Sequence, residues 1–485
     1  MKGIKFFPVK SHFYTSCLLI LFWNLFILAG QSQVIHPINH TTVIEMEAVQ
    51  TPSGAFVTAL MESDTAVSSG NYLAVYRSTD NGVSWDSVTS ILNNKPGNIA
   101  DPVMTIDSSG VISLVAMSNP PKNSWNECHL RLYQSIDDGM TWQLKGEPYS
   151  GTDMADYPQI ISSGSGKLHM TYTLYTPNSF INYIASSDGG TTWSTPVTFT
   201  APFGGFFQSV GCDLGITGNN AFCLAFGDYN HDSIYFSISI DSGLTWQPLD
   251  AIPRIIEFTV NKMISRKGLV PIGIISHQPH TLVSPLFFSV SHNQGSTWTT
   301  TTLCESAAYG EGFLDTAGIF HVVYNMKDSS EFKLIYTYSD DGGAIFKDPI
   351  TLYSGENNVN WSTGEYQSLI LAKDDLFHLT FVDNSDSAHA KQILFAPLLE
   401  GIRQQTNENT MPRIFPNPVH DVLNIELPPG SDFTEYEITD ILGKKLQSGK
   451  LKKTATQIRI TQKENGLLVL KLKASNRILV CKILK

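Results

Sequence analysis

A short turn-like motif recurs six times between residues 78 and 346 and limits the fold more than any other feature. The copies begin 57, 51, 53, 52 and 48 residues apart and read STDNGVSW, SIDDGMTW, SSDGGTTW, SIDSGLTW, SHNQGSTW and SDDGGAIF. The acid or amide can accept backbone hydrogen bonds, Gly supplies positive φ, and the final aromatic residue is an apolar plug. We therefore expect structural, not catalytic, roles for Asp80, Asp137, Asp188, Asp241, Asn293 and Asp341.

Short runs rich in β-branched and aromatic residues surround each motif, as in VISLVAMS and HLRLYQS before the second copy. Four strands in about 50 residues are typical of a β-propeller blade. A seventh set of strands, at 365–398, lacks the motif and an outer strand, which Gln33–Ile38 could supply. The prediction is an all-β chain with a seven-bladed β-propeller over 32–400, or six blades as the alternative.

The chain begins with the features of a secretory signal peptide. Lys2, Lys5 and Lys10 precede an apolar run from Cys17 to Ala29, which is short for a membrane span. We assign residues 1–31 to the signal, with an uncleaved anchor as the alternative, and expect no span in the mature chain. Further along, Cys212 and Cys223 flank a turn-like ITGNN, so they could form a disulfide or be two small buried residues.

Charge divides the chain into two unlike parts within a formal net charge of −12. Residues 413–485 hold 13 Lys and Arg against 7 Asp and Glu, whereas residues 11–412 hold 16 against 37. A region as acidic as residues 11–412 repels phosphate backbones, so we expect no nucleic-acid partner. The polar stretch 401–412 is suited to be a linker between the two parts.

The turn motifs resemble the Asp-boxes (BNR repeats) of sialidases and other Asp-box propellers, over residues 34–400. The resemblance implies the fold more strongly than the activity. Sialidases add three arginines that clamp a carboxylate, a nucleophilic Tyr with a Glu, and an acid/base Asp. Tyr366 resembles that Tyr, but no FRIP-like segment occurs near the start, and the arginines before residue 400 are Arg77, Arg131, Arg254 and Arg266.

Residues 413–485 resemble the type A sorting domain of proteins exported by type IX secretion. The matching features are Phe415–Pro418 (FPNP), the turn from Asp440 to Lys444, and the Lys-rich end, although Gly466-Leu467-Leu468 replaces the usual Gly-x-Tyr. Alternating strands predict a small β-sandwich. The resemblance implies the type IX machinery as a partner, and a location outside a Gram-negative cell, either secreted or on its surface.

Candidate site residues lie where a propeller commonly binds ligands, on the face away from the turn motifs. Two carboxylates in one pocket can divide into general acid and nucleophile or base, and aromatic side chains offer flat faces to sugars. The alternative is that the inner-strand acids only cap strand ends. Calcium is conceivable at these acids, although no D-x-D-x-D-G loop supports it and no cofactor is expected. The catalytic candidates are Asp156, Glu365 and Tyr366, and the ligand-binding candidates are Asp101, Tyr157, Asp213, Glu311, Trp125, Trp361 and His231.

Three functions follow from these features. The leading one is a secreted or cell-surface propeller that recognises or processes extracellular carbohydrate. The second is a sialidase-like exo-glycosidase, and the third is an adhesin or scaffold that binds a surface protein. Whether the chain is an enzyme stays open, because no complete catalytic set can be named.

Overall fold

The structure is a computed structural model that forms two compact units, residues 1–397 and 398–485, which are described separately. In the first unit it describes residues 33–35, 41–64, 71–91, 99–118, 128–175, 179–200, 212–218, 220–228, 233–252, 259–277, 284–328, 331–356, 367–372, 376–383 and 389–395. In the second it describes 412–415, 419, 421–427, 431, 433–440, 445–453, 455–460, 467–474 and 478–484. The predicted signal peptide and residues 401–411 of the predicted linker lie outside these ranges.

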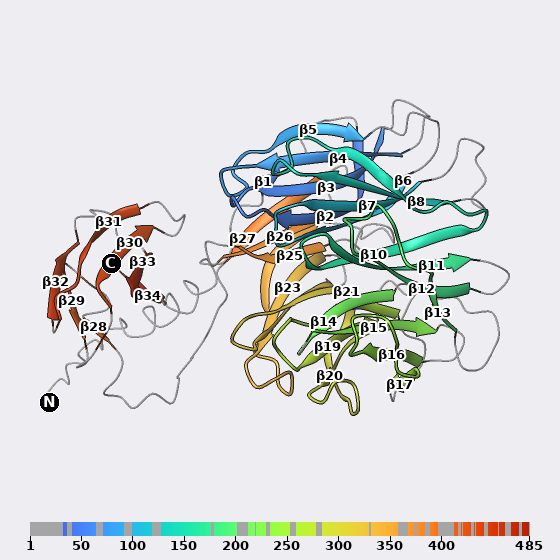
Figure 1. Ribbon diagram of the computed structural model, residues 1–485. Coiled ribbons are helices and arrows are strands. Elements are labelled where there is room, and N and C mark those ends of the chain that lie inside the picture. The colour runs from blue at the N-terminus through green and yellow to red at the C-terminus, as the bar shows by residue number, and fades with distance from the viewer. Residues whose placement is uncertain are drawn as a thin grey trace, which may run out of the picture. The chain divides into compact units, whose positions relative to one another are not determined.

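Every regular element in the described ranges is a β-strand, and in the N-terminal unit the sheets follow one another in chain order (Figure 1). Four sheets each contain four antiparallel strands. Their members are β2 (Thr41–Gln50), β3 (Phe56–Asp64), β4 (Asn71–Ser78) and β5 (Asp86–Ile91); β6 (Ile99–Ile106), β7 (Ile112–Ser118), β8 (His129–Ser135) and β9 (Gln143–Tyr149); β10 (Met154–Gly164), β11 (Lys167–Tyr175), β12 (Ser179–Ser186) and β13 (Val197–Phe199); β14 (Cys212–Thr217), β15 (Ala221–Asp228), β16 (Ser233–Ser239) and β17 (Asp250–Ile252).

One long strand joins the next two sets. The first half of β21 (Thr299–Leu314) pairs with β20, and its second half pairs with β22. It therefore serves as the fourth strand of one set and the first strand of the next, which gives a seven-stranded sheet. The other members are β18 (Thr259–Ile264), β19 (Ile272–His277), β20 (Ser284–Ser291), β22 (Phe320–Asp328), β23 (Glu331–Ser339) and β24 (Ile350–Glu356).

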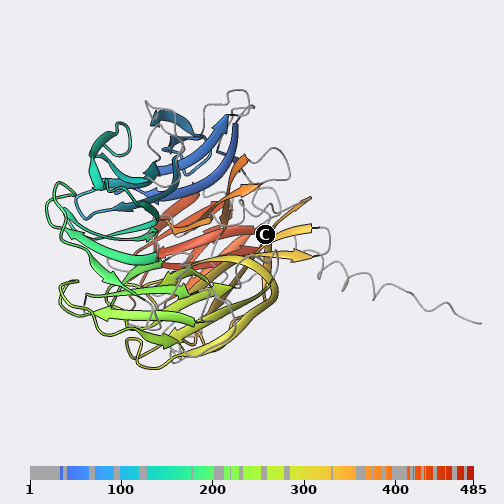
Figure 2. The ribbon, with the colours of Figure 1, turned by 90° about the vertical axis from the view of Figure 1, so that its right-hand side faces the viewer.

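The last sheet draws on both ends of the unit. It contains β25 (Gln367–Leu371), β26 (Phe377–Asp383), β27 (His389–Phe395) and, beside β27, β1 (Gln33–Val34). Gln33 pairs with Gln392, so the predicted use of the N-terminal segment as the outer strand is confirmed. The first strands of successive sets are neighbours from β2 and β6 onward, and β25 lies beside β2 (Figures 1 and 2).

The aromatic residue of each turn motif packs between its own sheet and the preceding one. Trp193, for example, contacts a buried cluster that includes Leu132 of β8 and Met170 of β11. This places a large apolar side chain where two twisted sheets would otherwise leave a gap. The same arrangement recurs for Trp85, Trp142, Trp246, Trp298 and Phe346.

Two separate constraints, one on the backbone and one on packing, require glycine at position 139 of the second motif. Gly139 has a φ of +85°, a conformation that side chains disfavour. A Cβ added there would also lie 2.5 Å from Cγ2 of Val57 in the preceding sheet. The turn therefore approaches its neighbour more closely than any larger residue allows.

The possible disulfide between Cys212 and Cys223 is not formed. In the β14–β15 hairpin Cys212 pairs with Phe226 and Cys223 pairs with Gly215, so the two cysteines are staggered along the ladder. Both thiols are buried and free. Of the two alternatives, the disulfide is wrong, and the residues are small members of the core.

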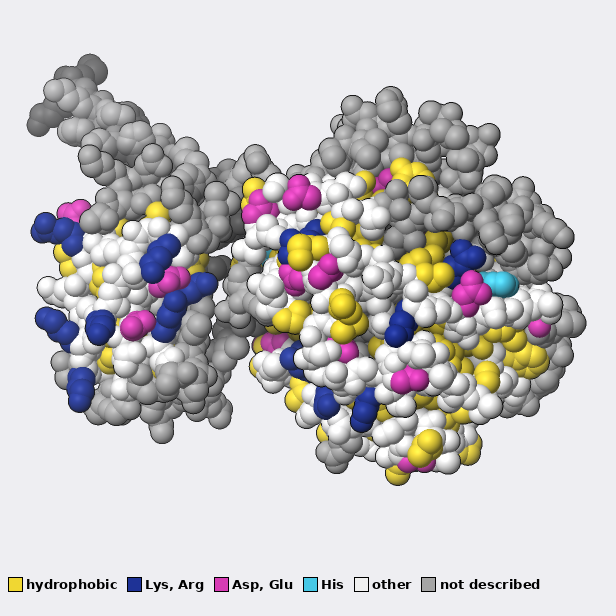
Figure 3. Space-filling model, turned by 45° about the horizontal axis from the view of Figure 1, so that its top comes forward, with side chains coloured by type: hydrophobic (Ala, Val, Ile, Leu, Met, Phe, Trp, Pro, Cys, Tyr) yellow, Lys and Arg dark blue, Asp and Glu magenta, His cyan; other side chains and the backbone are white. Residues whose placement is uncertain are grey.

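The C-terminal unit contains two antiparallel sheets around one core. The first has β28 (Arg413–Phe415), β29 (Val422–Glu426) and β32 (Ala455–Arg459); the second has β30 (Glu435–Asp440), β31 (Lys445–Lys450), β33 (Leu467–Lys473) and β34 (Ile478–Leu484). Leu423 and Ile458 of the first sheet share a buried cluster with Ile438 and Leu470 of the second. Lys and Arg side chains gather on the surface of this unit (Figure 3).

Candidate functional site

The registers of the first two strands in each set identify one equivalent position in all seven first strands. Each second strand has a buried apolar residue at its first or second position; in chain order these are Phe56, Ile112, Leu168, Phe222, Ile272, Phe320 and Phe377. The residue three places later pairs with the position in question. In chain order those positions hold Glu47, Val103, Gln159, Asp213, Lys262, Glu311 and Ser368.

Five of these side chains interact across sheets and form what we call the inner-strand cluster: Glu47, Asp213, Lys262, Glu311 and Ser368. Nζ of Lys262 lies 3.2 Å from Oε1 of Glu311, and Oγ of Ser368 donates to Oε1 of Glu47 at 3.3 Å. Asp213 accepts from the N–H of Met263 at 2.7 Å and from its neighbour Leu214 at 2.8 Å. The Lys262 side chain is 31% exposed, so solvent reaches the cluster.

The cluster alters the proton affinities of its members. Burial raises the pKa of Glu47 from 4.5 to about 7, against the opposing effect of Lys262. Burial also raises the pKa of Glu311. For Lys262 burial acts downward, but the charges of Glu311, Asp213 and Glu47 outweigh it and raise the pKa. Near neutral pH, therefore, one carboxyl group exchanges its proton beside a fixed positive charge.

A second acidic group lies closer to the starts of the first strands and consists of Glu45, Asp101 and Asp156. The N–H of Asp101 donates to Oε2 of Glu45, across two sheets. Asp101 and Tyr157 have φ values of 51° and 47°, and both stand at bulges in their strands. Bulges re-aim side chains and recur near functional sites. Asp156 accepts from the N–H of Tyr157 at 2.9 Å and is 6% exposed.

The structure thus divides the sequence-predicted candidates into three sets. Asp213 and Glu311 belong to the inner-strand cluster, and Asp101 and Asp156 belong to the second group, beside Tyr157. Glu47, Lys262 and Glu45 were not predicted, although their register positions could have revealed them once the strands were aligned. Five candidates lie outside the described residues: Glu365, Tyr366, Trp125, Trp361 and His231.

The acids of the turn motifs hold the turns together. Asp137 accepts from the hydroxyl of Ser135 and from the N–H of Thr141, both at 2.8 Å. The pKa of Asp188 is lowered to about 2 by hydrogen bonds from the N–H and hydroxyl of Thr192. Equivalent contacts to their own turns are made by Asp80, Asp241, Asn293 and Asp341.

The described arginines do not converge on the acids. Arg77 pairs with Asp138 of a neighbouring turn, and Arg131 lies 3.2 Å from Glu147 on β9. Arg266 donates to the carbonyl of Leu314 at 3.3 Å and lies over the ring of Phe313. Arg254 is outside the described residues. Within those residues no group of three or more His, Cys, Asp or Glu side chains could hold a metal ion.

Residues 413–485 match the family described as "Secretion system C-terminal sorting domain". This indicates a secreted or cell-surface protein of a Gram-negative bacterium and supports export by the type IX system. No curated protein matches the chain. Within the described residues, none of the elements is a helix of the length and apolarity that crossing a membrane requires.

Three solved structures illustrate what the N-terminal part is similar to. An α-L-arabinanase from Penicillium chrysogenum has 12% identity and a TM-score of 0.46, covering 75% of this chain and 97% of its own. An α-L-arabinofuranosidase from Fusarium graminearum has 12% identity and a TM-score of 0.46, covering 76% and 97%. The NanB sialidase from Streptococcus pneumoniae has 14% identity and a TM-score of 0.43, covering 76% and 70%.

Proposed function

We propose that the N-terminal unit is a seven-bladed Asp-box β-propeller that takes an extracellular carbohydrate at its inner strands. Seven four-strand sets support this blade count, with β1 completing the last set and β21 shared between two. The contact of β25 with β2 supports a ring. Six motif turns with the same hydrogen bonds support the Asp-box identity.

The observation that carries the proposal is the inner-strand cluster. Glycoside chemistry needs one carboxyl group that is protonated near neutral pH and another that is ionised. Glu47, with a pKa of about 7, suits the proton donor, and Asp213, held by two N–H groups, suits the carboxylate partner. Lys262 offers N–H donors to sugar hydroxyl groups. Asp156 lies nearer the start of its strand than Gln159, which holds the equivalent cluster position, and it would contact a longer ligand.

A neutral saccharide fits the cluster better than a sialic acid. A substrate carboxylate requires cationic partners, and bidentate arginines serve it best. The described arginines are engaged elsewhere, and three acids surround the single lysine of the cluster. The sialidase-like alternative is therefore the weaker one, and no contact among the described residues favours the adhesin.

The test is a panel of aryl-glycosides and a glycan array applied to the full secreted chain. If it processes sugar, Glu47→Gln lowers turnover about 100-fold or more, because a positioned proton donor contributes at least that much. Asp156→Asn weakens binding of longer substrates. Glu305→Gln, an exposed acid on β21, is the matched control and leaves both unchanged.

Binding on the array without turnover supports recognition in place of catalysis, provided that Glu47→Gln weakens it. The proposal is wrong if the chain neither binds nor cleaves any glycan, or if Glu47→Gln behaves as Glu305→Gln does.

A further inference from the structure

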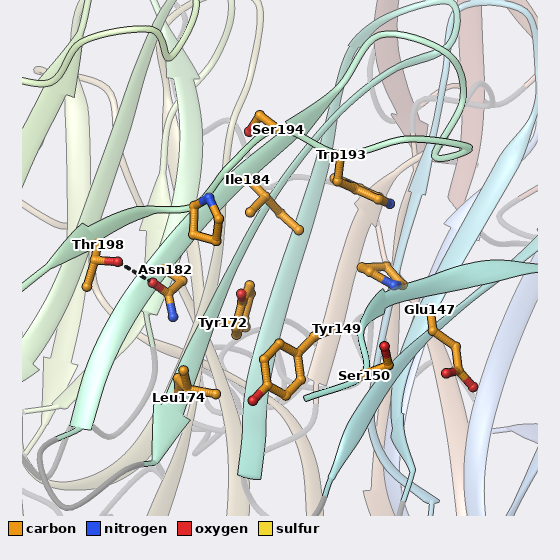
Figure 4. Close-up of a pocket in the computed structure, with 12 residues that line it drawn as sticks. Glu147, Tyr149, Ser150, Tyr172, Leu174, Asn182, Ile184, Trp193, Ser194 and Thr198 are labelled. Atoms are coloured by element: carbon orange, nitrogen blue, oxygen red, sulfur yellow. Dashed lines mark hydrogen bonds between the residues drawn. The ribbon is translucent and has the colours of Figure 1, made fainter. Parts of the chain in front are cut away.

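A groove of about 530 Å³ lies between two sheets of the N-terminal unit, and none of its lining residues belongs to the inner-strand cluster (Figure 4). It is bounded by the end of β9, by residues of β11 and β12, and by the segment from the end of the third turn motif to β13. Its size suits a small-molecule or saccharide site. The lining residues are Glu147, Pro148, Tyr149, Ser150, Tyr172, Leu174, Asn182, Ile184, Trp193, Ser194, Pro196 and Thr198.

Three aromatic side chains line this groove. The ring centroids of Tyr149 and Tyr172 are 5.6 Å apart, with the planes inclined by 44°. Trp193 is the third. Trp85, Trp142 and Trp298 donate their indole N–H to the glycine carbonyl of their own turn, whereas Trp193 and Trp246 make no such bond in the described part of the chain. The polar edge of Trp193 is therefore available to a ligand.

Two buried polar groups also open into the groove. The Tyr172 side chain is 2% exposed and lines the groove, so its hydroxyl can donate a hydrogen bond to a ligand there. Asn182 is 3% exposed; its Oδ1 accepts from Thr198 at 2.7 Å, which leaves the amide N–H groups for a ligand.

The charge of the groove selects a neutral ligand. Glu147 is the single charged residue in the lining, and it lies 3.2 Å from Nε of Arg131 and 3.5 Å from Nδ1 of His129. Burial raises the pKa of Tyr172 to about 12, so its hydroxyl stays a neutral donor. Because the carboxylate of Glu147 is already paired, and no Lys or Arg is among the lining residues, the groove offers an anionic sugar no cationic partner.

We propose that this groove is a second saccharide site, in which a neutral oligosaccharide stacks on Tyr149 and Trp193 and bonds through its hydroxyl groups to Tyr172 and Asn182. Flat apolar faces beside a few fixed donors are what a sugar ring requires. The site does not depend on the inner-strand cluster or on catalysis there. It would hold a polymer to the protein while another stretch occupies the inner strands.

The test is calorimetric titration of the full secreted chain with neutral oligosaccharides of gluco, galacto, manno, xylo and arabino configuration. We expect at least one to bind, and we expect Tyr149→Ala and Tyr172→Phe each to weaken that binding about tenfold. Trp298→Phe, in an equivalent turn of another sheet, is the matched control and binds as the unaltered chain does. Sialyllactose binds about tenfold more weakly than its neutral counterpart.

The proposal is overturned if no neutral sugar binds the unaltered chain, or if both groove variants bind every sugar as tightly as the unaltered chain. If Glu47→Gln alone loses binding, the inner-strand proposal stands and the groove proposal fails. The opposite result, loss in the groove variants alone, supports the groove and separates it from the catalytic question.

Discussion

The same sheets carry two sets of acidic residues whose pKa values are shifted in opposite directions. At the motif turns, Asp137 and Asp188 are held by hydrogen bonds from their own turn, and the pKa of each is lowered. At the inner strands, burial raises the pKa of Glu47 and Glu311. An acid surrounded by donors stabilises a fold as an anion, whereas an acid that burial deprives of water becomes a proton carrier.

The largest expected effect is a loss of stability when the close contact between a motif turn and the preceding sheet is disturbed. Gly139→Ala should lower the free energy of unfolding by about 3 kcal/mol, from positive φ and overpacking against Val57 together. Gly318→Ala is the matched control, because its φ is +85° but no atom lies within 4 Å of an added Cβ. It should cost about 1 kcal/mol. Equal losses in urea unfolding would show that the contact with Val57 contributes nothing.

The next effect tests whether one lysine holds the inner acids together. Lys262→Met leaves Glu311 and its neighbours without a cation and should cost about 2 kcal/mol, less than a fully buried pair because Lys262 is 31% exposed. Lys347→Met, which breaks an exposed pair with Asp340, is the control and should leave the urea midpoint unchanged. If the two variants have the same urea midpoint, Lys262 stabilises the inner-strand cluster no more than Lys347 stabilises an exposed ion pair.

The third effect is a difference in pH dependence between the two sets. Glu47 keeps its proton when folded between its ordinary pKa of 4.5 and about 7, so the folded state binds more protons and stability falls as pH rises through this window. The turn acids act in the opposite direction. Asp188 and Asp241 have lowered pKa values, so they stabilise the folded state above their ordinary pKa of 3.8, and this stabilisation is lost as the pH falls towards about 2.

Glu47→Gln should therefore remove a slope of at most about 1.4 kcal/mol per pH unit in the upper window and leave the acid limb unchanged. Urea midpoints measured across the pH range from 4.5 to about 7 provide the check. An unchanged slope would mean that Glu47 titrates as an ordinary exposed glutamate.

Sequence reasoning succeeded where the information is local and repeated. Each of the six motifs lies at a turn between strands, and the strand set that lacks the motif, at 365–398, takes its outer strand from the N-terminal segment as predicted. It missed Glu47 and Lys262, because a single glutamate or lysine in a strand looks like any other until its register is known. The possible disulfide was wrong for the same reason, because two residues that flank a turn need not lie opposite each other in the ladder.

By itself, the amino-acid sequence determined an all-β chain, its repeating turns and a distinct basic C-terminal module, because turn chemistry and strand periodicity act over a few residues. Only the tertiary structure decided which acids meet. Residues 47, 213, 262 and 311 come from four sets of strands, and bulges shift the registers of three of those sets, so their proximity depends on how whole sheets are placed. Proton affinity follows from that placement, since burial and neighbouring charge are properties of the assembled inner strands.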